Sequence, residues 1–356
     1  MKTSVSFICS FTLFLLFQSC NFEPEQEIDI LVSGDGFGMI QHLFSSPDTL
    51  TFTIPELKED LFVSKRPFHF LIDSLVYIPD QKAKRVIVFD ESGSYIGHIG
   101  GEGEGPGEFL NVQHFVKNNN RLYVYDNFLM RISVYDDNLE YLKTIPINHR
   151  ISDFIIIDNR IIAFSHYSPF IFSSFDMNGN VIHEFLKPND EREAIFLARF
   201  QDGGLDFDIQ HNLIYGIYPD QFKIFVLNKN LELQHILGSN DATRYRPSVP
   251  DFPRSLDPYK FEDQHIEYWE SFHHIMNIYV DDNSGHIIIP YYKQLSQNEW
   301  NFYINVYQKD GGIVTEGVRI PGNTLIGTIN GGAVYIAFDN ETNENNTSIL
   351  KYELNF

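Results

Sequence analysis

The stretch LVYIPDQKAKRVIVFDESGSYIGHIG, residues 75–100, decides the fold class. It contains an apolar segment ending in Asp80, a short polar loop, a segment of the type I-x-V-Y/F-D, a turn and a further apolar segment. Short runs of Val, Ile, Tyr and Phe bounded by Gly, Asp, Asn and Pro are typical of β-strands joined by turns. The stretch therefore predicts three consecutive strands.

The same pattern recurs five more times along the chain. The further copies cover residues 121–147, 160–186, 213–238, 286–320 and 333–356. Equivalent residues of the six copies are separated by 47, 39, 53, 73 and 47 residues, counted between Leu75, Leu122, Ile161, Ile214, Ile287 and Val334. Periods near 40 to 50 residues with about four strands each are characteristic of propeller blades.

Each copy is preceded by one more apolar stretch, which supplies the innermost strand of a blade. These stretches are residues 66–73, 112–117, 151–158, 205–210, 273–280 and 324–329. The sixth copy lacks an outer strand, and TLTFTI at residues 49–54 has the length to replace it. We therefore expect an all-β, six-bladed β-propeller over residues 49–356, with four antiparallel strands per blade. The N-terminal strand would close the last blade and pair its open edge.

The link between the first two blades resembles a known family. GGEGEGPGEF at residues 100–109 is similar to the G-x-G-P-G-E-F/Y link of NHL/TolB-like six-bladed β-propeller lipoproteins of didermic bacteria. The resemblance covers roughly residues 60–356. Gly103, Gly105 and Gly107 would let the chain turn from the outer edge of one blade to the centre of the next. A phosphate-binding loop is disfavoured, because no Lys follows and no helix is expected behind it.

The N-terminus indicates export. Residues 1–20 combine Lys2, an apolar run from Val5 to Phe17, and a small residue directly before Cys20. This arrangement predicts a lipoprotein signal peptide with Cys20 lipidated at the cut, and the alternative is an ordinary secretory signal in which Cys20 is incidental. Residues 21–48 would form an acidic tether. We expect an outer-membrane lipoprotein in the cell envelope, with its domain exposed at the surface.

The composition limits the classes of partner. The chain has 356 residues, of which 43% are hydrophobic and 15% aromatic, so it can bury a large core. Its formal net charge is -22, which excludes nucleic acid as an expected partner, because phosphate binding needs an excess of Lys and Arg. The membrane would be contacted only through the lipid anchor.

A long insertion interrupts the repeat at residues 239–274. Four prolines are followed by the aromatic-rich stretch FEDQHIEYWESFHH, which could form a short helix. Loops of this length are usually lids, binding loops or disordered segments. Tyr268 and Trp269 would contact ligand if the insertion is a lid, because aromatic faces suit sugar or peptide binding. The alternative is a segment that simply packs on one face of the ring.

Polar residues recur near the starts of the inner strands. The residues in this column are His69, His114, Asp153, Asp206 and His274. Inner strands surround the central channel of a propeller, so these side chains could converge there. His69, His114 and His274 could hold a divalent metal, and the resemblance adds that some NHL-like propellers are metal-dependent lyases. Arg66 and Arg150 lie beside the column and could instead bind an anionic ligand. Polar side chains that only line a hydrated channel would give the same pattern.

Catalytic motifs such as G-x-S-x-G and H-E-x-x-H do not occur in the sequence. Asp126, Asp136 and Asp137 flank strands and are interpreted as turn formers. We therefore expect a binding or interaction module, with a glycan, a peptide or an envelope protein as its partner. Two alternatives remain: a metal-dependent lyase or hydrolase that uses the His/Asp column, and a scaffold subunit without a small ligand.

Overall fold

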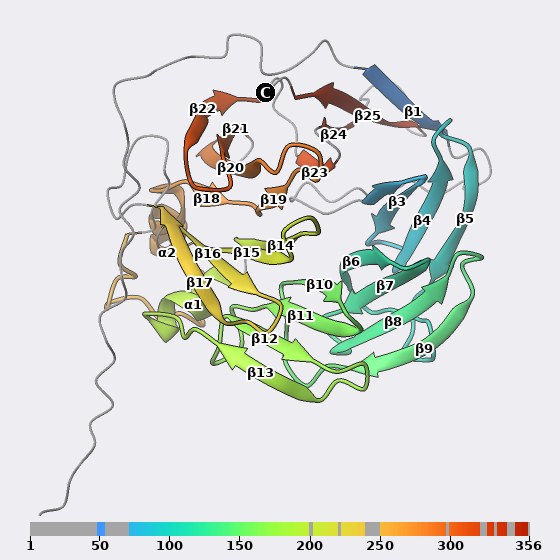
Figure 1. Ribbon diagram of the computed structural model, residues 1–356, viewed down its shortest axis with the longest axis horizontal. Helices are drawn as coiled ribbons and strands as arrows, with labels where there is room; N and C mark the ends of the chain where they lie inside the picture. The colour runs from blue at the N-terminus through green and yellow to red at the C-terminus, as the bar shows by residue number, and fades with distance from the viewer. Residues whose placement is uncertain are drawn as a thin grey trace, which may run out of the picture.

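The computed structural model describes residues 48–53, 71–198, 202–219, 222–238, 250–296, 299–320, 326–330, 333–339 and 346–354. These residues form six antiparallel sheets around a common axis (Figure 1), which is the predicted β-propeller. The predicted signal peptide, Cys20 and all but the last residue of the predicted tether lie outside the described residues.

Each sheet is one blade, numbered here in chain order. Blade 1 contains β2 (Leu71–Asp73), β3 (Leu75–Asp80), β4 (Arg85–Asp90) and β5 (Tyr95–Gly100). Blade 2 contains β6 (Val112–Asn118), β7 (Arg121–Asp126), β8 (Arg131–Asp136) and β9 (Tyr141–Pro146). Blade 3 contains β10 (Asp153–Ile157), β11 (Arg160–Phe164), β12 (Phe172–Phe175) and β13 (Val181–Phe185).

The second half of the ring follows the same order with two variations. Blade 4 contains β14 (Gly204–Asp208), β15 (Leu213–Tyr218), β16 (Lys223–Asn228) and β17 (Leu233–Gly238). Blade 5 has a divided inner strand and contains β18 (His274–Ile275), β19 (Tyr279–Val280), β20 (Ile287–Ser296), β21 (Glu299–Tyr307) and β22 (Ile313–Arg319). Blade 6 contains β23 (Ile326–Asn330), β24 (Ala333–Asp339), β25 (Asn346–Glu353) and β1 (Asp48–Thr53).

The N-terminal strand closes the ring as predicted. β1 pairs antiparallel with β25 as the outermost strand of blade 6, from Asp48 opposite Lys351 to Thr53 opposite Asn346. The inner strands β2 and β23 of the first and last blades are also in contact. This closure covers the edge of β25, which would otherwise offer unpaired backbone groups to another chain.

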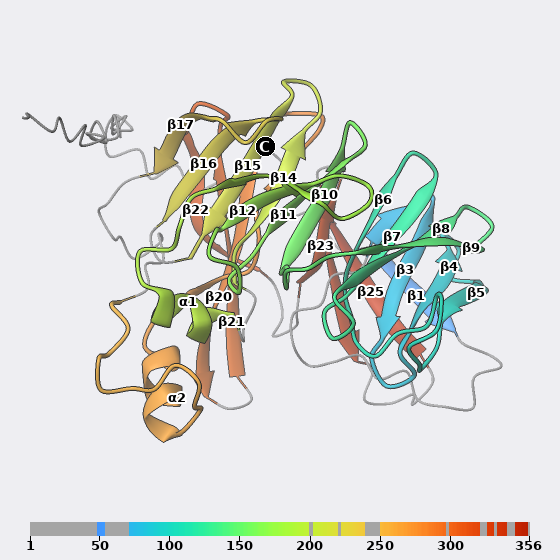
Figure 2. The ribbon, with the colours of Figure 1, turned by 90° about the horizontal axis from the view of Figure 1, so that it is seen from below.

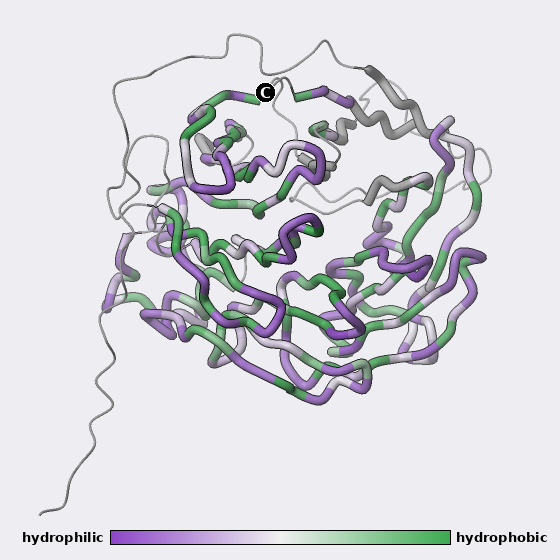
Figure 3. The backbone as a smooth tube through the Cα atoms, viewed as in Figure 1, coloured by the Kyte–Doolittle hydropathy of each residue, from purple (hydrophilic) through white to green (hydrophobic). Residues whose placement is uncertain are grey.

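Hydrophobic side chains fill the space between neighbouring blades. Val88, Phe109 and Val124 belong to the cluster that joins blades 1 and 2, and Ile132 and Phe154 to the next cluster. Three further clusters join blades 3 to 6 in the same way. Figure 3 shows the hydrophobic residues along the strands and hydrophilic residues at many of the turns. Each fully buried aromatic or aliphatic side chain contributes about 2 kcal/mol, so the blades stabilise one another.

In blades 1 to 3, an Asp at the end of the third strand or directly after it forms the following turn. Asp136 Oδ1 accepts the N–H groups of Asn138 and Glu140 at 3.0 and 2.9 Å. Asp90 and Asp176 accept equivalent bonds in blades 1 and 3. The turn-forming role predicted for Asp136 is confirmed, and it explains why the repeated segment ends in Asp.

Asp126 forms the loop between the second and third strands of blade 2. Its buried carboxylate accepts two N–H groups from that loop, Phe128 and Leu129, at 2.8 and 2.9 Å. It also accepts the N–H groups of Leu110 and Asn111, at 2.6 and 3.0 Å, from the link between blades 1 and 2. The turn-forming role predicted for Asp126 is thus confirmed.

The glycine-rich link at residues 100–109 is held by side chains of blade 2. The guanidinium of Arg131 donates to the carbonyl oxygens of Glu104, Gly105 and Glu108, at 2.8, 2.6 and 2.9 Å. Gly107 has φ of 77°, a left-handed conformation that favours glycine. Phe109 is fully buried between the first two blades. The motif therefore has a structural role, and it fixes the chain where it passes from blade 1 to blade 2.

Two short helices lie together on one face of the ring (Figure 2). α1 (Glu191–Leu197) is in the link between blades 3 and 4, and α2 (Asp263–Glu270) is in the predicted insertion. Phe196 of α1 packs edge-on against Tyr268 of α2, with ring centres 5.4 Å apart. Within the described residues, neither helix has the length and apolar character needed to cross a bilayer.

Candidate functional site

The face that carries α1 and α2 is also the face on which the inner strands begin. The links that lead into β6, β10, β14 and β18 end there, together with the loops between the second and third strands of each blade. We call this the helix-bearing face. It contains the described members of the predicted column, whereas Arg66 and His69 lie outside the described residues.

His114 and Asp153 form a buried pair between blades 2 and 3. His114 Nε2 lies 2.8 Å from Asp153 Oδ1, and both side chains are almost inaccessible to solvent. Asp153 Oδ2 accepts the N–H of Leu205 at 3.1 Å and the side-chain amide of Asn277 at 3.2 Å. One carboxylate thus connects the inner strands of blades 2, 3 and 4 with the segment between β18 and β19 of blade 5.

The approach of these groups requires a glycine. A Cβ atom at Gly204 would lie 2.0 Å from Asn277 Oδ1 and 2.6 Å from Asp153 Oδ2, so any other residue would force the cluster apart. The strand register shows why Gly204 stands here. It pairs with Ile217, as His114 pairs with Tyr125 and Asp153 with Phe164, and all three partners are the fifth residues of their strands. Gly204 is therefore the blade 4 equivalent of His114 and Asp153.

Asp206 lies two residues further along β14 and connects blades 4 and 5. Its Oδ2 accepts the N–H of Val280 at 2.8 Å, and its Oδ1 accepts the N–H of Phe207 at 2.8 Å. Burial raises the pKa of Asp206 to about 7, with smaller contributions from the negative charges of Asp153 and Asp282. The residue as a whole is partly buried.

His274 belongs to a different cluster from His114. Its Nδ1 lies 2.6 Å from Asp202 Oδ2 and its Nε2 lies 2.9 Å from the Trp269 carbonyl oxygen. Asp202 and a backbone carbonyl oxygen thus face the two ring nitrogens of His274. His166 Nε2 contacts the carbonyl oxygen of Asp202, and burial lowers the pKa of His166 to about 4.

The two described members of the predicted metal set, His114 and His274, lie in separate clusters. Across the described ranges, no group of three or more His, Cys, Asp or Glu side chains is arranged to hold a metal ion. Both ring nitrogens of His274 already face Asp202 and Trp269. His114 contacts Asp153 on the inner strand of another blade. The described residues therefore do not fit the metal site that the family resemblance implies.

The insertion packs on the ring through the residues predicted to contact ligand. Tyr268 and Trp269 are 8% and 6% exposed, and the Trp269 ring lies 4.4 Å from that of His274. The Tyr268 hydroxyl donates to the Pro250 carbonyl oxygen at 2.6 Å. By contrast, Tyr259 and Phe261 in the same insertion are 75% and 49% exposed. Among the described residues of the insertion, these two are therefore the aromatic residues whose side chains are exposed.

Exposed aromatic side chains gather on the helix-bearing face. Five Phe and Tyr side chains are exposed among the residues whose burial the structure describes, and only Tyr141 of these lies on an outer strand. The other four lie on this face, in the β7–β8 loop, the β11–β12 loop and the insertion; they are Phe128, Tyr167, Tyr259 and Phe261. Arg150, predicted to bind an anion, is exposed and covers the Tyr167 ring at 5.5 Å.

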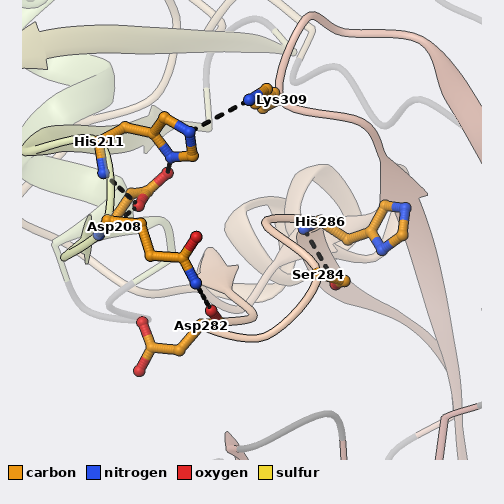
Figure 4. A network of polar contacts seen from close by, with 7 residues as sticks. Asp208, His211, Asp282, Ser284, His286 and Lys309 are labelled. Atoms are coloured by element: carbon orange, nitrogen blue, oxygen red, sulfur yellow. Dashed lines mark hydrogen bonds and ion pairs between the residues drawn. The ribbon is translucent and has the colours of Figure 1, made fainter.

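The opposite face has a smaller polar network between blades 4 and 5 (Figure 4). His211 Nδ1 lies 2.7 Å from Asp208 Oδ2, and His211 Nε2 lies 3.1 Å from Lys309 Nζ. The Gln210 side chain also donates to the Asp282 carbonyl oxygen. These contacts join hairpin loops of two blades, and their geometry is explained by that structural role.

Comparisons with known proteins agree with the fold. The family DUF5128, described as a 6-bladed beta-propeller, matches residues 69–218. A Bacteroides vulgatus structure from the DUF4221 family is 13% identical, with a TM-score of 0.60 over 88% of this chain and 98% of that one. A Bacteroides fragilis structure, described as a candidate exported protein, is 14% identical, with a TM-score of 0.62 over 88% of this chain and 96% of that one. No curated protein matches the sequence.

Two residues that complete the cluster around Asp153 could not be identified from the sequence. Asn277 and the N–H of Leu205 are essential partners of Asp153, but neither is titratable and neither has a motif. Asn277 lies within the apolar stretch 273–280 that was assigned to the inner strand. Its one signal was a polar residue interrupting that stretch.

Proposed function

We propose that the protein is exported to the cell envelope and binds a glycan, a peptide or a partner protein on the helix-bearing face. Cys20 would carry the lipid anchor, in an outer-membrane lipoprotein whose domain is exposed at the surface. The leader-like residues 1–20 support export, and so does the likeness in fold to a Bacteroides fragilis protein described as a candidate exported protein.

One observation carries the proposal: four of the five exposed aromatic side chains among the described residues lie on one face. Aromatic rings provide large contact areas with little loss of conformational entropy, and they stack on sugar rings and peptide groups. The loops that carry Phe128 and Tyr167 are fixed by the hydrogen bonds of Asp126 and Ser165. A rigid platform with adaptable loops is how a propeller commonly carries a binding site.

The test is a glycan and peptide array probed with the purified protein and with two single variants, Phe128→Ala and Tyr167→Ala. Tyr141→Ala is the matched control, because Tyr141 is also an exposed aromatic residue but lies on the outer strand β9. We expect at least one ligand whose binding is weakened by the first two variants and unaffected by the control. Binding that depends equally on Tyr141 would contradict the proposal, and no binding on either array would exclude the glycan and the peptide.

The anchor is tested separately. Replacing Cys20 by Ala should prevent incorporation of a radiolabelled fatty acid and release the protein from the membrane fraction. A protein that stays in the membrane fraction and is unlabelled in both forms would exclude lipidation of Cys20.

A further inference from the structure

The β11–β12 loop, residues 165–171, carries two aromatic rings that are each covered by a cation. The Arg150 guanidinium carbon lies 5.5 Å from the centre of the Tyr167 ring, and Lys187 Nζ lies 5.2 Å from the centre of the Phe170 ring. Arg150 precedes β10 and Lys187 follows β13, so two separate links converge on one loop. Two positive charges are thereby placed beside exposed aromatic surface on blade 3.

The loop is fixed before any ligand arrives. The Ser165 hydroxyl donates to the Arg150 carbonyl oxygen at 2.5 Å and accepts the N–H groups of Tyr167 and Ser168 at 3.0 and 3.1 Å. The Tyr167 hydroxyl donates to the Ala198 carbonyl oxygen at 2.8 Å. These bonds hold the backbone of Arg150 and both the backbone and the hydroxyl of Tyr167. Ligand binding would therefore cost little conformational entropy of this loop.

Both cations are available to an external anion. Arg150 and Lys187 are exposed, and neither forms an ion pair with another residue that the structure describes. The buried carboxylates of the same face are already engaged, Asp153 with His114 and Asp202 with His274. The whole chain has 48 acidic against 26 basic residues, and these two cations nevertheless flank one loop with no carboxylate paired to either among the described residues.

We propose that Arg150–Tyr167 and Lys187–Phe170 bind the carboxylates of an acidic oligosaccharide that contains uronate residues. A guanidinium pairs with a carboxylate through two parallel hydrogen bonds, and an ammonium donates to it with less geometric specificity. Tyr167, which is 42% exposed, offers ring surface for the C–H face of a sugar. Two cations beside one loop suit carboxylates that repeat along a polymer better than the single terminal carboxylate of a peptide.

This inference rests on the proposed function, because the site lies on the same face, but it can fail independently. Titration calorimetry of the purified protein with trigalacturonate, neutral galactotriose and trialanine separates the possibilities. We expect trigalacturonate alone to bind, with an affinity that falls as NaCl is added. Arg150→Gln and Lys187→Gln should each weaken binding on the order of tenfold or more.

Arg121→Gln is the matched control, because Arg121 is exposed at the β6–β7 hairpin on the opposite face. Circular dichroism melting curves establish that each variant is folded. Binding of galactotriose as strongly as trigalacturonate, unaffected by Arg150→Gln, would overturn the acidic ligand and leave the proposed function standing. Binding of trialanine that depends on Arg150 would replace the saccharide by a peptide. If none of the three probes binds, the inference is wrong, and the array decides the proposed function on its own.

Discussion

Replacing Asp206 by Asn should make the protein progressively more stable than the wild type as pH rises. The pKa of Asp206 is raised from 3.8 to about 7, chiefly because burial disfavours the charged form. In the unfolded chain the carboxyl regains its ordinary pKa of about 3.9. Between about pH 4 and pH 7 the folded protein therefore binds more protons at this site than the unfolded chain does, and its stability falls with rising pH.

The size of the effect follows from the same pKa difference. A shift of about three units corresponds to at most about 4 kcal/mol, at about 1.4 kcal/mol per unit. The introduced amide would be neutral at every pH, and its oxygen could still accept the N–H of Val280 that Asp206 Oδ2 accepts at 2.8 Å. The difference in unfolding free energy between variant and wild type should thus rise by up to about 4 kcal/mol between pH 4 and pH 7, and then level off.

The assay is urea unfolding of both proteins at pH values from 4 to 9. The readout is how the difference in unfolding free energy between variant and wild type changes with pH. A pH-independent cost of accommodating the amide therefore does not affect it. Asp176→Asn is the control, because hydrogen bonds from Asn180 and Asn178 lower the pKa of Asp176 to about 2 on the surface. Its pH-dependent contribution is confined to acid below about pH 4. A difference for Asp206→Asn that stays flat from pH 4 to pH 8 would refute the reasoning, because Asp206 would then be ionised in the folded protein.

Three further predictions concern the ring itself. Gly204→Ala should lower the unfolding free energy measured in urea by about 2 to 3 kcal/mol, because the new Cβ would lie 2.0 Å from Asn277 Oδ1. Gly97→Ala is the control and should lower it by less than about 1 kcal/mol, because the nearest atom to its new Cβ is 3.4 Å away. Equal costs for the two would show that the close approach at Gly204 is unimportant. Arg131→Gln should speed amide hydrogen exchange within residues 101–109, because three carbonyl oxygens lose their donor, and unchanged exchange there would contradict that role. Deleting residues 48–53 should expose the edge of β25 and produce oligomers in size-exclusion chromatography, and a stable monomer would show that β1 is dispensable.

The fold could be predicted from the sequence because each copy of the repeat consists of short local patterns. Alternating strands and an Asp at the end of the third strand recur in blades 1 to 3, and the expected closing strand at residues 49–54 corresponds to β1 at Asp48–Thr53. α1 was not anticipated, because its seven residues are too few to establish a helical period. α2 falls within the stretch that suggested a short helix.

The site was less predictable because it depends on register between blades. His114 and Asp153 were aligned correctly, since both pair with the fifth residue of the next strand. Asp206 lies two residues beyond the equivalent position on β14, which Gly204 occupies. His274 lies in the divided inner strand of blade 5, where the residue that contacts Asp153 is Asn277. The links between blades differ in length, so counting along the sequence cannot fix which side chains meet at the channel.

The polar column connects the inner strands beneath the helix-bearing face, and its members His114 and Asp153 are mostly shielded from solvent. Among the described strands, neighbouring blades share no backbone ladder, so the contacts of Asp153 and Asp206 supply hydrogen bonds between their inner strands. His114 and Asp153 are 7% and 3% exposed, which leaves them little surface for a ligand. Arg150, three residues before Asp153, is exposed and lies over Tyr167. The same short link therefore provides both a buried residue that fixes the mouth of the channel and an exposed one that can meet a ligand. Substitutions in the column should change the stability and pH dependence of the protein, whereas substitutions in the loops should change what it binds.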